Sequence, residues 1–341
     1  MRTIWLRSLM LSAGLMAAHA ARAQAPSYQV REIRGGLYWL SDGAYNTIFL
    51  VSSKGVIAVD PLPTLGQRYL DAVASVTRQP ITHIVYSHEH TDHIGGASLF
   101  PGRPAIIAQS ETARVLARRR DPRRPLPSIT FDERYVLRLG GQTLILEYKG
   151  PNHCPGNVFV YAPRQKVLML VDVVYPGYAP YPDLGVAQDV PGYIEAHRRV
   201  LDFDFNDFVG GHVDHIGSRA DVERSLEFVL DLKRTAEGAV ADKSFPTFLM
   251  QRPGPASQST WFAHDDYETD RIARCYDLML PRWSARLAGV ERSLRAHCRS
   301  MIVALAIQFP PERPGPAGDT GADRPADGAR DASAGSAEDR Q

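Results

Sequence analysis

The sequence predicts an α/β fold in which strands end in loops that carry metal-binding side chains. The β-branched and apolar run 81–86 leads directly into a cluster of histidines and carboxylates at 87–93. Apolar or alternating segments of strand length recur from residue 28 to residue 211, with stretches of helical spacing between them. Residues 221–238 and 265–307 show helical spacing instead, which predicts a helical C-terminal part.

The N-terminal part is predicted to form two pairs of strands, followed by a helix. Segments 28–33 and 37–40 alternate or run apolar, and segments 46–51 and 55–60 are separated by a Ser-Ser-Lys-Gly turn. The helical pattern at 66–76 then leads into the strand that precedes the histidine cluster.

The cluster Ser87-His88-Glu89-His90-Thr91-Asp92-His93 has the composition of a metal-binding loop. Residues two apart in an extended segment point the same way, so His88 and His90 can reach one ion. Asp92 and His93 lie beyond the turn, where they face a second ion. Imidazole and carboxylate ligands without thiolate favour zinc, with iron, manganese or cobalt as alternatives.

The pattern His88-x-His90-x-Asp92-His93 resembles the signature of the metallo-β-lactamase-fold hydrolase superfamily. The resemblance implies an αββα four-layer sandwich over residues 27–220, with two mixed sheets packed together, helices outside and the site at one edge. It also implies further ligands at strand ends downstream. Asp60 then supports the metal loop, or else it serves as a turn or helix cap before Pro61.

After the metal loop, further strands lead to the position of a third ligand. A strand is predicted at 105–108, a helix at 111–120, and strands at 135–139 and 143–148. In the loop that follows, the resemblance implies that His153 is the third ligand of the first metal, and Cys154 is interpreted as a small buried filler. The basic run 118–124 is interpreted as a solvated face.

The predicted hairpin 158–161 and 167–171 ends in Asp172, at the place where the superfamily holds a residue that can bridge two metals. An Asp here resembles the glyoxalase II and lactonase groups more than the true β-lactamases, which usually have Cys or Ser. Tyr175 resembles a tyrosine of some lactone hydrolases, whose hydroxyl meets the substrate oxygen. The segment 176–185 forms either a wall of the substrate pocket or a packed surface loop.

The last predicted strand, 207–211, follows a helix at 190–201 and closes on His212. The resemblance implies that His212 completes the second metal site with Asp92 and His93. His215 is interpreted as a supporting or incidental residue, and His83 as a structural histidine.

The two ends of the chain predict an exported protein with a tail that does not fold. Residues 1–23 have the basic start, apolar middle and small-residue cleavage site of a signal peptide, which implies a periplasmic or secreted protein without a stable membrane anchor. Residues 309–341 are too poor in apolar side chains to bury enough surface and are predicted to be disordered. The net charge of +1 gives no reason to expect a nucleic-acid partner.

The helical extension at 221–308 is predicted to cap the site or to support a homodimer. Phe245 to Ser259 is interpreted as a loop because it is rich in Pro, Gly and Ser. Cys275 and Cys298 lie in neighbouring helical segments separated by Pro281, and they can pair in an oxidising compartment.

The residues and the resemblance together predict a zinc-dependent hydrolase that acts on a small molecule. Its site holds two divalent ions and uses a metal-bridging hydroxide to cleave an ester, lactone or thioester. Asp92 and Tyr175 are the candidate catalytic residues, Asp92 relaying a proton in addition to its role as a ligand. The alternatives are a β-lactamase and a non-catalytic metal- or ligand-binding protein of the same fold.

Overall fold

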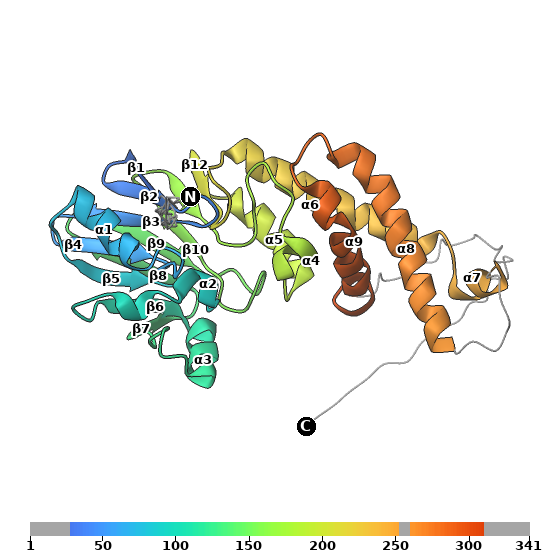
Figure 1. Ribbon diagram of the computed structural model, residues 1–341, viewed down its shortest axis with the longest axis horizontal. Coiled ribbons are helices and arrows are strands. Elements are labelled where there is room, and N and C mark those ends of the chain that lie inside the picture. The colour runs from blue at the N-terminus through green and yellow to red at the C-terminus, as the bar shows by residue number, and fades with distance from the viewer. Residues whose placement is uncertain (1–27, 252–259, 310–341) are drawn as a thin grey trace, which may run out of the picture. The chain divides into compact units, whose positions relative to one another are not determined.

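The computed structural model describes residues 28–251 and 260–309, and in it two mixed β-sheets face each other with helices on the outside (Figure 1). This arrangement confirms the predicted αββα fold. The predicted signal peptide at 1–23 lies outside the described residues, as does the predicted tail apart from its first residue.

The first sheet has seven strands in the order of the sequence, β1 to β7. Neighbouring strands are antiparallel from β1 to β4 and parallel from β4 to β7. The strands are β1 (Gln29–Arg34), β2 (Leu37–Ser41), β3 (Asn46–Ser52), β4 (Gly55–Val59), β5 (Ile81–Val85), β6 (Ala105–Gln109) and β7 (Ile129–Phe131).

The second sheet has five strands in the order β12-β11-β10-β9-β8. Only the β11 and β12 pair is parallel. The strands are β8 (Arg134–Leu139), β9 (Gln142–Glu147), β10 (Phe159–Ala162), β11 (Val167–Met169) and β12 (Asp207–Val209).

The main core lies between the two sheets. Ile57 and Val59 of β4 pack in one buried cluster with Leu146 of β9 and Met169 of β11. Each of these side chains is fully removed from water, which stabilises the fold by about 1.5–3 kcal/mol per side chain. The sandwich therefore fixes the strand ends that carry the metal-binding loops.

Helices cover the outer faces of the sheets. Helix α1 (Gln67–Val76) buries Tyr69 and Val73 in a second apolar cluster against the first sheet, and α3 (Ser110–Arg119) packs on β6 and β7. The shorter elements near the site are α2 (Thr91–Ile94), η1 (Ala97–Leu99), α4 (Pro182–Val186) and α5 (Val190–Val200).

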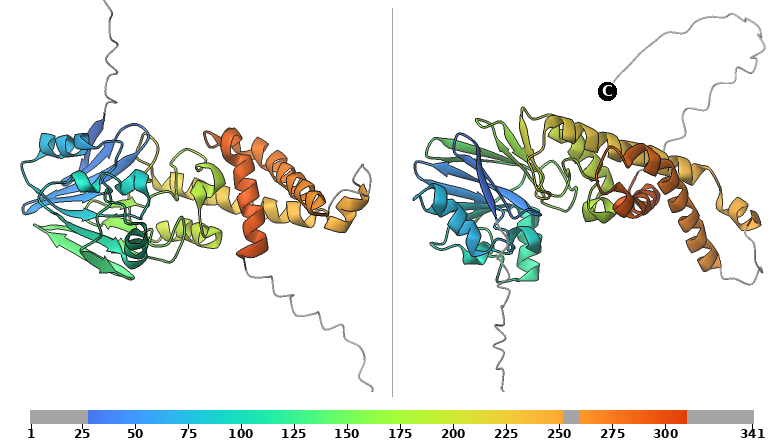
Figure 2. Two further views of the ribbon diagram at one scale, coloured as in Figure 1. Left: turned by 60° about the horizontal axis from the view of Figure 1, so that its bottom comes forward. Right: turned by 45° about the horizontal axis from the view of Figure 1, so that its top comes forward.

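The C-terminal part consists of helices that pack on one another (Figure 2). They are α6 (Arg219–Ala241), α7 (Phe245–Gln251), α8 (Thr260–Trp283) and α9 (Val290–Ile307). Ser218 caps α6 through a reciprocal hydrogen-bond pair with Asp221. Cys275 on α8 and Cys298 on α9 form a disulfide with their Cα atoms 5.9 Å apart, a pairing that the sequence allowed but left open.

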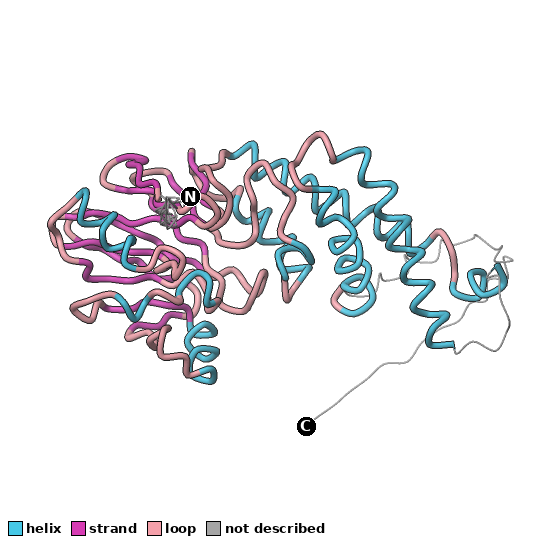
Figure 3. The backbone as a smooth tube through the Cα atoms, viewed as in Figure 1, coloured by secondary structure: helices cyan, strands magenta, loops and turns pink. Residues whose placement is uncertain are grey.

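Two predictions about the C-terminal part were wrong. Residues 245–251 form a helix, because Ser244 accepts a hydrogen bond from the Thr247 amide and Pro246 occupies the first turn, where no amide donor is needed (Figure 3). Helix α8 also continues through Pro281 to Trp283.

Among the described residues, no helix combines the length and apolar character required to cross a bilayer.

Candidate metal centre

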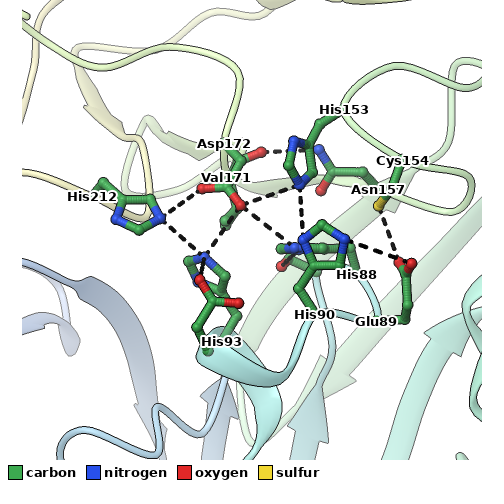
Figure 4. A network of polar contacts seen from close by, with 12 residues as sticks. His88, Glu89, His90, His93, His153, Cys154, Asn157, Val171, Asp172 and His212 are labelled. Atoms are coloured by element: carbon green, nitrogen blue, oxygen red, sulfur yellow. Dashed lines mark hydrogen bonds and ion pairs between the residues drawn. The ribbon is translucent and has the colours of Figure 1, made fainter. Parts of the chain in front are cut away.

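The predicted ligands come from four loops at one edge of the sandwich (Figure 4). His88, His90, Asp92 and His93 follow β5, and the other three, His153, Asp172 and His212, lie in the loops before β10, after β11 and after β12. The donor atoms form three groups whose members lie within 4.8 Å of one another. These groups are His88, His90, His153 and Cys154; His88, His93 and Asp172; and Asp92, His93 and His212.

The Asp172 carboxylate lies at the centre of the cluster. Its Oδ2 atom is 3.3 Å from Nε2 of both His93 and His153 and 3.5 Å from Nε2 of His88, and its Oδ1 atom is 2.9 Å from Nε2 of His212. Burial acts to raise the pKa of Asp172, but His93 and His153 outweigh it and hold that pKa well below its usual range. Asp172 is therefore a carboxylate. One of its oxygens faces His88, His93 and His153, and the other faces His212.

The donor set fits divalent metal ions. Nε2 of His88 is buried without a hydrogen-bond partner among the described residues, although it faces Asp172. Ring nitrogens also face each other in pairs, at 3.0 Å between His153 and His90 and at 3.2 Å between His93 and His212. A divalent ion satisfies such converging lone pairs, and imidazole with carboxylate is a ligand set typical of zinc and similar ions.

A hydrogen-bond relay orients His88. The buried Asp60 carboxylate accepts hydrogen bonds from the Ser87 amide at 2.7 Å and from the Ser87 hydroxyl at 2.6 Å. Because that hydroxyl proton is used, Ser87 Oγ accepts from Nδ1 of His88, 2.9 Å away, and the lone pair of Nε2 faces the centre. Asp60 thus supports the metal loop and is not a simple turn cap.

The loop that carries His153 is fixed by two buried asparagines. The Asn152 side-chain oxygen accepts from the His153 amide at 2.7 Å and from the Asn157 side chain at 2.9 Å. Asn157 also donates to the carbonyl of Val171, the residue before Asp172. One asparagine pair therefore connects ligands that lie on different strands.

Cys154 is buried, as predicted, but it also has a polar partner. Its thiol donates to Glu89 Oε2 at 3.0 Å, and burial raises the pKa of the thiol well above its usual value. Arg124 was predicted to lie on a solvated face, and this was wrong. Arg124 is buried and donates to the carbonyl of Glu89. One residue of the basic run therefore anchors the metal loop.

The backbone around the last ligand is strained. Val213 has φ of 69°, a region that β-branched residues rarely occupy. Asn46 holds it there by donating from its side chain to the carbonyls of His212 at 2.7 Å and of Val213 at 2.8 Å. Gly211 has φ of 85°, and a Cβ there would lie 2.6 Å from Val171. Residue 211 must therefore be glycine for His212 to reach the centre.

Tyr175 is buried with its ring beside that of His212, the centroids 5.7 Å apart. Next to it, residues 183–186 all have positive φ, which makes α4 partly a left-handed turn. A Cβ at Gly185 would lie 2.9 Å from the Tyr175 hydroxyl. Helix α9 supports the turn, because Nδ1 of His297 accepts from the Leu184 amide at 3.1 Å and Ser300 donates to Asp183 at 2.8 Å.

Two further histidines lie outside the cluster, as predicted. His83 on β5 is half-buried and pairs with the Thr82 hydroxyl. His215 is exposed and pairs with Asp214.

Sequence reasoning missed Ser87, Asn157 and Arg124, and for each the signal was only a polar residue near a predicted ligand or in a basic run.

The Metallo-beta-lactamase superfamily sequence model matches residues 40–236. The 2,4-dinitroanisole O-demethylase subunit alpha of Nocardioides sp. (strain JS1661) is 33% identical over 209 residues, which are 59% of this chain and 62% of that protein. The metallo-beta-lactamase type 2 of Elizabethkingia meningoseptica is 25% identical over 48% of this chain and 68% of its own length. The chain thus spans less than two thirds of the first of these relatives.

Solved structures show the same fold. A metallo-beta-lactamase from Pontibacter korlensis superposes with a TM-score of 0.53 at 21% identity, over 60% of this chain and 99% of that one. Metallo-beta-lactamase IND-7 superposes with a TM-score of 0.53 at 21% identity, over 61% of this chain and 100% of its own. The superposed share leaves about two fifths of this chain outside the shared fold.

Proposed function

The chain belongs to the metallo-β-lactamase superfamily, and on that premise we propose that it is an exported, binuclear metal-dependent hydrolase of an ester, lactone or thioester. The observation that carries the proposal is the position of Asp172. Its two oxygens face histidines of both halves of the cluster, as a carboxylate shared between two ions must.

The ligands divide into two sets. His88, His90 and His153 would hold one ion, and Asp92, His93 and His212 the other, with Asp172 between them. When bound, two such ions, for which zinc suits the donor set best, supply Lewis acidity and lower the pKa of a bound water toward neutrality.

The protein's own residues would orient the substrate and move protons. The carboxylate of Asp92 is partly exposed and lies 3.5 Å from Nε2 of His93, so it can accept a proton at the solvent side of the site. Burial raises the pKa of Tyr175 well above its ordinary value, so its hydroxyl keeps its proton and can donate to a substrate oxygen.

Asp172 also supports a finer placement within the superfamily, near the glyoxalase II and lactonase groups. Two further candidate functions rest on the relatives. One is β-lactam hydrolysis, which the likeness to named β-lactamases favours and the carboxylate at position 172 disfavours. The other is cleavage of an aryl methyl ether, which the 33% identity to an O-demethylase subunit favours. A non-catalytic binding protein is disfavoured because all the predicted ligands meet in one place.

Bound metal and hydrolysis should be measured together on protein lacking residues 1–23. The substrate panel is a lactone, a thioester, a cephalosporin, an aryl phosphodiester and an aryl methyl ether. About two metal equivalents with turnover of the lactone or thioester would support the proposal. Turnover of only the cephalosporin or the ether would select that alternative, and the absence of bound metal would overturn the proposal altogether.

The variants His88→Ala and Asp172→Ala should abolish hydrolysis and reduce the metal content. Each removes an atom that faces the centre and leaves neighbouring polar groups without a partner. The control is His215→Ala, since His215 is exposed and lies outside the cluster. Full activity in either of the first two variants would contradict the mechanism.

Localisation and assembly are part of the same proposal. Export to the periplasm or the medium rests on the signal-like residues 1–23, and a disulfide between Cys275 and Cys298 is consistent with an oxidising compartment. A homodimer through the C-terminal helices is supported by the exposed apolar side chains of Leu278, Val303 and Ile307.

A further inference from the structure

A small cavity lies directly beside the metal centre. It has a volume of about 290 Å³, and His212 and Tyr175 contribute to its lining. This volume is close to the lower end of the range for small-molecule sites, about 300–1,000 Å³. A molecule in the cavity would therefore reach the cluster at the His212 end.

Two distant parts of the chain form most of the cavity wall, and Ala44, His212 and Val213 complete it. Residues 175–182 contribute from the sandwich, and residues 288–293 contribute from the connection between α8 and α9 and the first turn of α9. The backbone joins these parts, because the Ala179 amide donates to the Ala288 carbonyl at 2.9 Å and the Ala288 amide donates to the Gly177 carbonyl at 3.0 Å. The C-terminal extension is thus a structural part of the cavity.

The wall is mostly apolar and aromatic, with the polar side chains of His212 and Ser293 and the cation of Arg292. Tyr175, Tyr178 and Tyr181 line it together with Pro180 and Pro182. Flat tyrosine and proline surfaces favour a planar, aromatic molecule. The lining contains no carboxylate that could neutralise a cation.

Arg292 is the lining residue with a permanent positive charge. Its side chain has no ion pair or hydrogen bond within the described parts of the chain. Two nearby arginines differ, because Arg286 pairs with Glu227 and Arg295 stacks on the Tyr276 ring at 4.4 Å. The Arg292 guanidinium is therefore available to a ligand, and a carboxylate is the group that it binds best.

We propose that the substrate is an aromatic compound carrying a carboxylate, and that Arg292 is the residue that selects for this anion. The aromatic body would lie between the tyrosine and proline surfaces, and the bond to be cleaved would lie at the His212 end. The statement that the bound molecule is a substrate rests on the proposed function. Recognition itself is a binding property and is tested without turnover.

The test measures binding of two matched probes to the metal-loaded full chain by calorimetry. The probes are 4-methylbenzoate and the neutral 4-methylbenzamide, which have the same ring and nearly the same shape. Arg292→Gln should weaken 4-methylbenzoate binding about tenfold, equivalent to about 1.4 kcal/mol, and change 4-methylbenzamide binding less than about twofold. Arg292→Lys should keep part of the preference for 4-methylbenzoate over 4-methylbenzamide.

The matched control is Arg295→Gln, one turn further along α9 and outside the cavity lining, which should bind both probes as the wild type does. The inference is overturned if Arg292→Gln binds 4-methylbenzoate normally, because the carboxylate then binds elsewhere, for example to the metals. It is also overturned if both probes weaken equally or if the wild type binds neither.

The outcomes separate this inference from the proposed function. Selective loss of 4-methylbenzoate binding together with no hydrolysis of any panel substrate would leave the anion site in place and remove the hydrolase. Hydrolysis of a lactone or thioester with no effect of Arg292→Gln on either probe would support the hydrolase and overturn the anion site.

Discussion

At the scale of the residue, the orientation of His88 depends on a chain of hydrogen bonds that begins at Asp60. Burial raises the pKa of Asp60 to about 6, while His93 and the two hydrogen bonds from Ser87 act in the opposite direction. The carboxylate accepts both of those bonds, which leaves Ser87 Oγ to accept from His88. The orientation of one ligand is thus set two residues away from the metal.

The variant Asp60→Asn should weaken metal binding about 10- to 100-fold. An amide group at position 60 can donate to Ser87 Oγ, so the Ser87 hydroxyl would donate to Nδ1 of His88. The ring proton would then move to Nε2 and block the nitrogen that faces the centre. Competition with a chromogenic chelator measures the affinity. Asp214→Asn, at an exposed carboxylate, is the control, and equal affinities in the two variants would refute the relay.

The ligands were the most predictable residues and their supports were the least. His88 to His93 are contiguous in sequence, and the resemblance to a known family located His153, Asp172 and His212. The role of Arg124 depends on a contact with Glu89, 35 positions away, and that of Arg292 on a cavity wall shared with residues 175–182, and spacing along the chain reveals neither. A basic run looks solvated in sequence even when one member is buried.

At the scale of the element, the strands and long helices were predicted well because their apolar periodicity is regular. The exceptions are short. Strand β7 has three residues, and α4 contains the left-handed residues Leu184 and Val186. Leucine and valine rarely adopt that conformation, so no sequence pattern indicates it. Tertiary contacts with α9 override the local preference there.

The disulfide between α8 and α9 should matter for both stability and binding. Its removal in the double variant Cys275→Ser, Cys298→Ser frees a loop with a sequence separation of 23, and the free energy of unfolding should fall by about 3 kcal/mol. Because α9 carries Arg292, the dissociation constant for 4-methylbenzoate should also rise.

Urea unfolding, with and without a reductant, checks this prediction. Reductant should destabilise the wild type and leave the double variant unchanged, since the remaining Cys154 is buried and unpaired with sulfur. If the reductant left the urea midpoint of the wild type unchanged, the disulfide would not contribute to the free energy of unfolding.

At the scale of the whole molecule, stability should fall in acid because of a buried histidine between α5 and α6. His197 is fully buried between the Tyr193 carbonyl at 2.8 Å and the Ser225 hydroxyl at 3.0 Å, and burial lowers its pKa from 6.5 to about 4. The unfolded chain therefore binds a proton at a higher pH than the folded chain. The contribution of His197 is complete above pH 6.5 and is lost as the pH falls toward 4, up to about 3 kcal/mol.

The variant His197→Gln should accordingly lose less stability than the wild type between pH 7 and pH 4.5. Urea unfolding at both values, in the presence of a chelator so that acid-driven metal loss does not contribute, measures the difference. His215→Gln serves as the exposed control and should follow the wild type. Equal losses of unfolding free energy in the wild type and both variants would refute the assignment of the acid effect to His197.

Under the proposed function, the cavity wall would separate cleavage from recognition. The groups that face the metals come from residues 88–212, whereas the cation and the far wall come from residues 288–293. Under this proposal, substitutions or insertions in the connection between α8 and α9 would alter which molecules bind while the metal-binding residues stay unchanged. Redesign of the protein to bind a new compound would begin in that connection.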